Sequence, residues 1–483
     1  MKQKPAPAFC SRRHFVRASA FSLGSMALAS LLQDENLLAA PVKPFLGGER
    51  FDLTPKPSHR SAQAKAVISL FMMGGPSQVD LMDPKPGMAK WDGKPFPGKI
   101  KYDNAAEASS TVFASPFKFR AHGQCGTEIS ELLPHLGSIV DDVAVIRSMH
   151  TGVNNHLQSM WAMNTGTFRG GYPSLGSWVS YALGSETKDL PGYVAMTHPA
   201  GLPQFAQQHW TNGWLPSIYQ GVQVRASEPR ILNLDPSDHL RGEAQRNQID
   251  FIQSLNRDHL AQHPAELDLD ARISSYELAG RMQTAASEAF DISRESDATK
   301  KLYGIDQDAT RDYGTRCLIA RRLVERGVRC VQLLTIGQSW DHHGNIMTAL
   351  PNSCREVDQP AAALVKDLKA LGLLDTTVVH WGGEMGRLPV AQNRISAKVG
   401  RDHNTYGFSM WVAGGGFKGG HVHGATDEWG HHAVEDIVNH YDYHATLLHL
   451  LGFDHQKLIY KRNGQALSLT NNQGAEVIKE LLA

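Results

Sequence analysis

Ten residues, Ala64–Met73, read AKAVISLFMM and are followed directly by the turn residues Gly74-Gly75-Pro76. A short apolar run bounded by glycine and proline is typical of a strand that is buried on both faces. The lysine- and proline-rich stretch before it, Asn36–Gln63, shows no apolar periodicity. The run therefore predicts the first strand of a sheet, with a turn at its carboxyl end.

Apolar runs and helical stretches alternate along the rest of the chain. Four further strands are predicted over Val143–Ile146, Val328–Leu334, Thr376–Trp381 and Phe408–Ala413. Helical periodicity is found over Thr310–Gly327, Glu356–Leu371 and Tyr443–Leu451. This alternation predicts an α/β fold in which helices cover both faces of a mostly parallel sheet.

The first forty residues differ from the rest. Paired arginines in Ser11–Val16 (SRRHFV) precede the uncharged stretch Ala18–Leu32, and Ala39-Ala40 offer a cleavage site. This order predicts a twin-arginine (Tat) secretion signal over residues 1–40 rather than a basic N-terminal arm. The mature protein would begin near Pro41, with residues 41–63 as a linker, and would be periplasmic or secreted. The Tat route carries folded proteins, often ones that already hold a metal or cofactor.

Composition limits what the mature chain can be. No other stretch is long and apolar enough for a transmembrane helix. Removing five basic and two acidic residues with the signal leaves 43 basic and 46 acidic residues, and this balance argues against nucleic acid as a partner. The four remaining cysteines form no CxxC pair, which indicates buried thiols or one disulfide. A charged segment of helical composition, about residues 227–307, predicts a helical insertion within the domain of residues 64–483.

Histidine and acidic residues gather in four clusters that follow predicted strands. These clusters are Met149–His156, Trp340–Asn345, Gly382–Arg387 and Gly400–Asn404. Ligands bind at the carboxyl ends of the strands in sheets of this kind, so we expect the clusters at one edge. Carboxylates and neutral imidazoles coordinate divalent metals, and glycine lets turns approach closely. The clusters therefore predict a metal site.

Other histidines are expected to be structural. His380 lies within an apolar strand, as a core histidine would. A glycine-rich segment typical of a surface loop holds His421, His423, His431 and His432.

Six motifs occur in a fixed order: LFMMGGPSQVDLMDPK (Leu70–Lys85), MHTGVNNH (Met149–His156), SWDHHGN (Ser339–Asn345), GGEMGRLP (Gly382–Pro389), GRDHN (Gly400–Asn404) and YHATLLHLLG (Tyr443–Gly452). Together they resemble the DUF1501 family of Tat-exported bacterial proteins, which are labelled sulfatase-like and related to the alkaline phosphatase superfamily. The resemblance runs over nearly the whole mature chain. It implies a three-layer α/β/α sandwich of the alkaline phosphatase type, with a metal site at the strand ends.

The superfamily pattern also implies roles for individual residues. An early metal-binding Asp would be matched by Asp80, or by Ser77 beside it. A later Asp-plus-His cluster would be matched by Asp341 and His343. The second acid and the late histidine of the pattern would be Glu384 and His403. For a site of this kind, zinc or calcium is the expected ion.

The nucleophile is where the chain departs from the pattern. Sulfatases carry Cys or Ser in a C/S-x-P-x-R run before Thr-Gly, whereas the segment ending in Thr165-Gly166 reads NNHLQSMWAMNTG. It contains no Cys, Pro or Arg, which excludes the oxidised-cysteine (formylglycine) mechanism. The same spacing falls on His156, as nucleophile, general base or metal ligand, and Thr151 is a second candidate nucleophile. Met385 stands where a second metal's histidine often follows the acid, which favours a single metal or a degenerate site.

Two functions remain open. One is an exported, metal-dependent hydrolase of sulfate or phosphate esters, acting on an anionic ester such as a sulfated glycan. In it the metal would polarise the ester oxygen, and Arg387 or Arg401 would clamp the anion. The other is a non-catalytic binding module on the same fold, which the missing nucleophile motif and Met385 favour. An exported redox enzyme ranks below both, because the chain has no glycine-rich dinucleotide motif or cysteine cluster.

Overall fold

A computed structural model describes residues 51–483, except for 101–108, 226, 233, 235, 238–240, 264–266 and 394. The predicted Tat signal, residues 1–40, and the first part of the predicted linker lie outside the described residues. Within the described part, no helix combines the length and the apolar character needed to cross a membrane.

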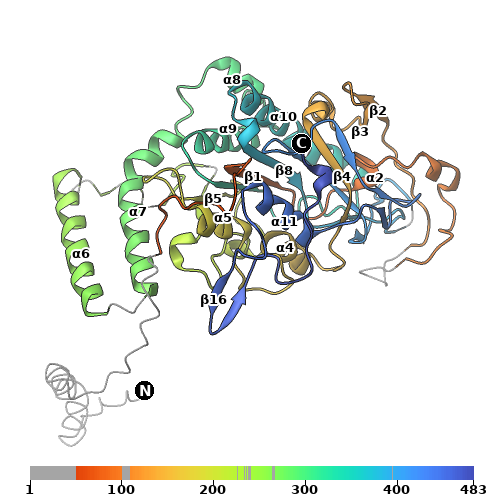
Figure 1. The fold of residues 1–483 in the computed structure, drawn as a ribbon. Coiled ribbons are helices and arrows are strands. Elements are labelled where there is room, and N and C mark those ends of the chain that lie inside the picture. Colours follow the sequence, from red (N-terminus) through yellow and green to blue (C-terminus); the bar gives the residue numbers. More distant parts are fainter. Residues whose placement is uncertain are drawn as a thin grey trace, which may run out of the picture.

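In the described chain, nine strands form one central sheet (Figure 1). Their order across the sheet is β12 (His421–His423), β4 (Val143–His150), β11 (Phe408–Ala413), β8 (Thr377–Gly382), β1 (Ala66–Phe71), β7 (Cys330–Leu334), β5 (Tyr193–Met196) and β6 (Val222–Val224), with β15 (Val438–Asn439) also paired to β4. β11 runs antiparallel to β4 and β8, and the other pairs are parallel. All of β1 is buried, as expected of a central strand covered on both faces.

Helices cover both faces of the sheet (Figure 1). One face carries α3 (Pro134–Gly137), α9 (Arg311–Glu325) and α10 (Ile346–Ala370), and the other carries α4 (His156–Thr165), α5 (Leu175–Leu183) and α11 (His440–Leu450). The prediction of a three-layer α/β/α sandwich with a mostly parallel sheet is confirmed.

Helix α10 begins ten residues before its predicted start at Glu356 and continues through Pro351 and Pro360. Proline removes a backbone hydrogen bond and normally ends a helix. Here the apolar face that begins with Ile346 and Leu350 is buried along the whole helix. The burial offsets the lost hydrogen bonds, so the helix is longer than the sequence predicts.

The segment predicted as a helical insertion forms α6 (Glu243–Gln262), α7 (Leu267–Phe290) and α8 (Asp297–Leu302). Helices α6 and α7 make a hairpin that stands off the sheet (Figure 1). Helix α7 packs on the body through buried residues such as Leu278 and Met282, whereas no residue of α6 is buried.

Shorter elements surround the sheet. Two-stranded ribbons pair β2 (Phe119–His122) with β3 (Thr127–Ser130), β9 (Gly386–Arg387) with β10 (His403–Asn404), β13 (Ala425–Thr426) with β14 (Ala433–Glu435), and β16 (Tyr460–Arg462) with β17 (Gln465–Leu467). Short helical turns are α2 (Gln78–Leu81), η1 (Pro86–Trp91), η2 (Val140–Asp142), η3 (Ala206–His209), η4 (Ser217–Tyr219), η6 (Leu374–Thr376) and η7 (Lys479–Leu481).

The described part of the predicted linker is packed against the domain. The backbone nitrogen of Lys56 donates to the Leu183 carbonyl at 2.9 Å. Its ammonium donates to the Tyr181 carbonyl at 2.9 Å and to the Tyr219 hydroxyl at 3.0 Å. Residues 51–63 therefore form an irregular strap rather than a free linker.

Candidate metal centre

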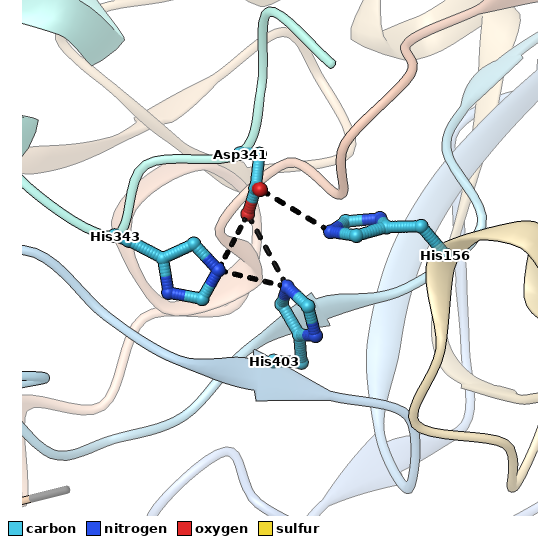
Figure 2. Close-up of side chains that lie close together, drawn as sticks. All are labelled: His156, Asp341, His343 and His403. Atoms are coloured by element: carbon cyan, nitrogen blue, oxygen red, sulfur yellow. Dashed lines mark hydrogen bonds and ion pairs between the residues drawn. The ribbon is translucent and has the colours of Figure 1, made fainter. Parts of the chain in front are cut away.

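Four side chains from three segments of the chain converge on one point (Figure 2). His156 is the first residue of α4, which follows β4; Asp341 and His343 follow β7; and His403 begins β10. When one ligand atom is taken from each side chain, these four nitrogen or oxygen atoms all lie within 4.8 Å of one another. β4 and β7 belong to one sheet and run in the same direction, so the segments that follow them meet at one edge.

The imidazole nitrogens converge on the Asp341 carboxylate (Figure 2). Asp341 Oδ1 lies 3.0 Å from His343 Nε2 and 3.3 Å from His403 Nε2, and these two nitrogens are 3.0 Å apart. His156 Nε2 lies 3.3 Å from Asp341 Oδ2. Two ligand atoms on a tetrahedral zinc ion, bound at about 2.0–2.1 Å, are roughly 3.3 Å apart. The four side chains therefore have the donor types of a tetrahedral metal site, and these four pairs of atoms have its spacing.

Residues outside the cluster hydrogen-bond to two of its histidines, and these bonds determine which ring nitrogen faces the cluster. His156 Nδ1 lies 2.6 Å from Glu384 Oε1, and His343 Nδ1 lies 3.2 Å from Gln392 Oε1. Carboxylate and amide oxygens accept, so each Nδ1 carries a hydrogen, and in the neutral ring that a metal ion requires the Nε2 lone pair turns inward. Outer partners of this kind orient metal-binding histidines. Gln392 was missed by the sequence analysis, since nothing in the surrounding residues distinguishes it.

Glu384, predicted as a metal ligand, lies behind His156 instead. It is fully buried, and its two oxygens accept the Gly74 backbone N–H at 3.0 and 3.2 Å in addition to the contact with His156. Gly74 has φ +112°, and a Cβ there would come within 2.5 Å of the Asp341 backbone nitrogen. The glycine turn after β1 thus approaches the cluster closely. The prediction for Glu384 is corrected, because its oxygens hold a backbone amide and the ring of His156.

Arg387, predicted to clamp the anion, is fully buried beside the cluster. Its Nη2 lies 2.6 Å from Asp341 Oδ1 and also donates to the Gly74 carbonyl, and its Nε donates to the Gly75 carbonyl at 3.0 Å. Because these groups use its donors, the guanidinium is not available to a substrate. Its position corrects the prediction and makes it a fixed cation next to Asp341.

Asp80 and Arg401, predicted as a ligand and as an anion clamp, bind each other. Arg401 Nε lies 2.8 Å from Asp80 Oδ2 and Nη2 lies 3.0 Å from Oδ1, and both side chains are fully buried. Ser77 Oγ donates to Asp80 Oδ2 at 2.6 Å. In this bidentate ion pair, two guanidinium nitrogens of Arg401 bind the two carboxylate oxygens of Asp80. Both predictions are corrected, as is the alternative of Ser77 as a ligand, since all three groups belong to this internal network.

Thr151, the second candidate nucleophile, lies beside the cluster but not in it. It is buried, and its hydroxyl donates to the Glu384 backbone carbonyl at 3.4 Å. Its backbone N–H donates to the Thr405 carbonyl at 3.1 Å. These contacts are those of a turn residue that fixes the path between β4 and α4.

The titratable groups of the cluster differ in the direction in which their pKa values are shifted. Burial raises the pKa of Asp341, but hydrogen bonds from the three histidines and the charge of Arg387 hold it well below its usual range. Burial lowers the pKa of His156, but its hydrogen bonds to Asp341 and Glu384 outweigh this and raise it to about 9. Burial is the dominant effect on His403 and lowers its pKa to about 4. Without a metal ion, the second carboxylate, Glu384, thus favours a positive charge at His156 over one at His403.

A second group of possible ligands, His198, Asp312 and Glu356, does not have the contacts of a metal site. His198 Nδ1 accepts the Ala200 backbone N–H at 3.1 Å, which leaves the hydrogen on Nε2, 3.7 Å from Glu356. Asp312 is paired with Arg316 at 2.6 Å. These residues form an ion-pair network.

Three histidines that were expected to be structural can be placed in the fold. His380 is a buried core residue, as predicted, and its Nδ1 contacts the Tyr443 hydroxyl. His423 and His431 are buried rather than in a surface loop. His423 belongs to strand β12, and the ring of His431 packs edge-on against Phe96.

Comparison with protein families gives a match over almost all of the described chain. The sequence model of the family described as "Protein of unknown function (DUF1501)" matches residues 64–482. The chain belongs to this family. No curated protein matches it.

Solved structures similar to this DUF1501 protein include three from bacteria. They are the lipoteichoic acid synthase LtaP of Listeria monocytogenes (11% identity, 86% of this chain and 78% of that chain, TM-score 0.35), the PsFucS1 sulfatase of Pseudoalteromonas sp. (13%, 87% and 72%, TM-score 0.37) and the phosphonate monoester hydrolase SpPMH of Silicibacter pomeroyi (11%, 87% and 76%, TM-score 0.36).

The DUF1501 chain has a histidine at the first residue of α4, where its motif departs from the sulfatase pattern. Both ring nitrogens of His156 are engaged, Nδ1 by Glu384 and Nε2 by Asp341. With Nδ1 held by Glu384 and Nε2 facing the other cluster residues, this arrangement fits the metal ligand among its three predicted roles.

Proposed function

We propose that this protein is a hydrolase of sulfate or phosphate esters that uses one divalent metal ion held by His156, Asp341, His343 and His403. The observation that carries the proposal is the convergence of three imidazole Nε2 atoms on one carboxylate. The outer contacts of His156 and His343 add to it, because they turn ring lone pairs toward the same point.

The donor set favours zinc among the expected ions. Zinc is bound by imidazole nitrogen and carboxylate oxygen in four-coordinate sites, whereas calcium takes six to eight oxygen ligands. A bound ion of this kind would polarise the ester oxygen and lower the pKa of water in the site.

The residues of the chain restrict how the ester is attacked. With the ion bound, both nitrogens of His156 would be used, Nδ1 by Glu384 and Nε2 by the ion, and Thr151 is buried with its hydroxyl turned to a backbone carbonyl. Water is therefore the attacking group in the proposed reaction. His343 is 36% exposed and marks the open side of the cluster, where an anionic ester such as a sulfated glycan would enter.

Hydrolysis by the purified chain tests the proposal directly. Protein stripped with a chelator would be reloaded with zinc, manganese or calcium and assayed on p-nitrophenyl sulfate, p-nitrophenyl phosphate and a sulfated glycan. We expect zinc-dependent turnover that His343→Ala lowers at least about 100-fold, because a metal ligand is lost. His421→Ala, which changes a half-buried histidine on edge strand β12, is the matched control and should retain turnover. Binding of the sulfated glycan without turnover would favour the non-catalytic module instead.

We also propose that the protein is exported by the Tat machinery and works in the periplasm or outside the cell. The support is the order of Arg12-Arg13, the uncharged stretch and the small residues Ala39-Ala40. Replacing both arginines with lysine should leave the chain uncleaved in the cytoplasmic fraction. Unchanged export of that variant would contradict the proposal.

A further inference from the structure

A large groove lies between the α6–α7 hairpin and the body of the domain, lined by both helices, by η4 and by strand β6. Its volume is about 940 Å³. None of the four cluster residues lines it, so the proposed hydrolase activity does not account for it.

The groove is open to solvent and is lined by exposed apolar side chains, with uncharged polar ones such as Gln245, Gln248 and Asn256 between them. Leu232, Ile252 and Tyr276 line it and are 62%, 44% and 68% exposed. Contiguous exposed apolar surface of this kind marks a binding site more often than a free surface. Among the described residues that line the groove, only Arg272 and Glu277 carry charge. The occupant that fits is therefore an uncharged, apolar segment rather than an anionic ester.

The described chain enters the domain at the rim of this groove. The Phe51 ring packs edge-on against Tyr219, with centroids 6.5 Å apart, and the Tyr219 hydroxyl donates to the Asp52 carbonyl at 3.2 Å. Tyr219 ends η4, whose other residues, Ser217 and Ile218, line the groove. Phe51, the first described residue, therefore lies beside the wall of the groove.

The sequence before Phe51 contains a segment of the required chemistry. Ala18–Leu32 has no charged residue and carries Phe21, Leu23, Met26, Leu28, Leu31 and Leu32. The 18 residues from 33 to 50 span up to roughly 60 Å when extended, so they bridge from Phe51 to any point of the groove. A tether of this length also gives the segment a high effective concentration at the groove.

We propose that the groove between the α6–α7 hairpin and the body binds the apolar segment Ala18–Leu32 of the same chain. Docking there removes apolar surface of both partners from water. Cleavage after Ala40 would separate the segment from the domain and free the groove. The inference does not rest on the proposed hydrolase activity.

Site-specific photo-cross-linking in the full chain tests the proposal. The aromatic photo-cross-linker p-benzoylphenylalanine replaces Tyr276, which lines the groove, or Phe251, which does not line it and is 63% exposed on α6. Both positions already hold exposed aromatic rings, so neither substitution should disturb the fold. We expect adducts from position 276 to residues 18–32, identified by mass spectrometry, and none to that segment from position 251.

A variant in residues 18–32 and the mixing of isotope-labelled with unlabelled chains show whether the groove binds this segment of its own chain or of a second copy. Leu28→Asp lies outside the domain and should reduce the adduct from position 276 at least tenfold. Mixing ¹⁵N-labelled and unlabelled chains should give adducts only within one chain. Adducts to a second copy, equal adducts from both positions, persistence in Leu28→Asp, or no adduct to residues 18–32 would each overturn the proposal.

Discussion

His343 Nε2 lies 3.0 Å from His403 Nε2. Two imidazole nitrogens at this distance either share one hydrogen or both face one cation. His343 already places a hydrogen on Nδ1, toward Gln392, so its Nε2 offers a lone pair. The same oxygen of Asp341 lies within 3.3 Å of both nitrogens. This arrangement favours a cation that can bind nitrogen and oxygen at short range.

The first prediction concerns metal content. The full chain should bind one zinc ion per molecule, measured by elemental analysis after removal of loose metal. His403→Ala should weaken binding by more than the roughly 10–100-fold that outer partners of a metal site contribute, because it removes a ligand. His421→Ala should keep the metal of the unaltered chain. Equal metal content in the His403 and His421 variants would contradict the assignment of the cluster.

The second prediction concerns the outer contact of His343. Gln392→Leu removes the oxygen that holds the Nδ1 hydrogen and should weaken zinc binding about 10–100-fold with all four ligands intact. Gln392→Glu keeps an acceptor and should restore most of the affinity. Titration against a chromogenic chelator measures both. If Gln392→Leu binds zinc as tightly as the unaltered chain, the ring is oriented by other contacts.

The position of the site could be predicted from the sequence, because its residues follow strands whose carboxyl ends lie at one edge of the sheet. The residues after Val143–His150 and Cys330–Leu334 meet because these strands lie in one sheet and run in the same direction. The helix–strand alternation contains this information, since it specifies a parallel sheet. Strand β11 was expected within the same pattern, but it runs antiparallel, and its residues give no sign of its direction.

The roles of single residues depend on packing that the sequence does not contain. His342 and His343 are neighbours, yet His342 is buried near Ser353 and only His343 joins the cluster. Asp80 and Arg401 are 321 positions apart, and only the folded chain makes them a pair. Residue type therefore identified the candidates, and side-chain direction separated ligands from internal contacts.

The third prediction concerns that internal pair. Arg401→Met or Asp80→Leu leaves one buried charge unpaired and should lower the free energy of unfolding by roughly 3–5 kcal/mol. The double variant removes both charges and should be more stable than either single variant. Denaturant unfolding monitored by circular dichroism measures all three. Normal stability in Arg401→Met together with a loss of anion binding would restore the predicted role as a clamp.

The fourth prediction concerns acid sensitivity. Burial lowers the pKa of His380 and His440 to about 3 and that of His444 to about 4. The unfolded chain titrates these groups near 6.5, so between about pH 6.5 and 4 it binds more protons than the folded chain. The free energy of unfolding should therefore fall as the pH falls through this range.

Substituting one of these histidines should make the fall less steep. His444 Nε2 donates to the Met163 carbonyl at 2.9 Å, and His444→Gln retains a side-chain N–H while removing the titrating group. The slope of unfolding free energy against pH should decrease by up to about 1.4 kcal/mol per pH unit, the value for one proton. Melting curves of the unaltered chain and of His444→Gln, recorded from pH 7 to pH 4, provide the measurement. Equal slopes in the two proteins would show that the acid response comes from other groups.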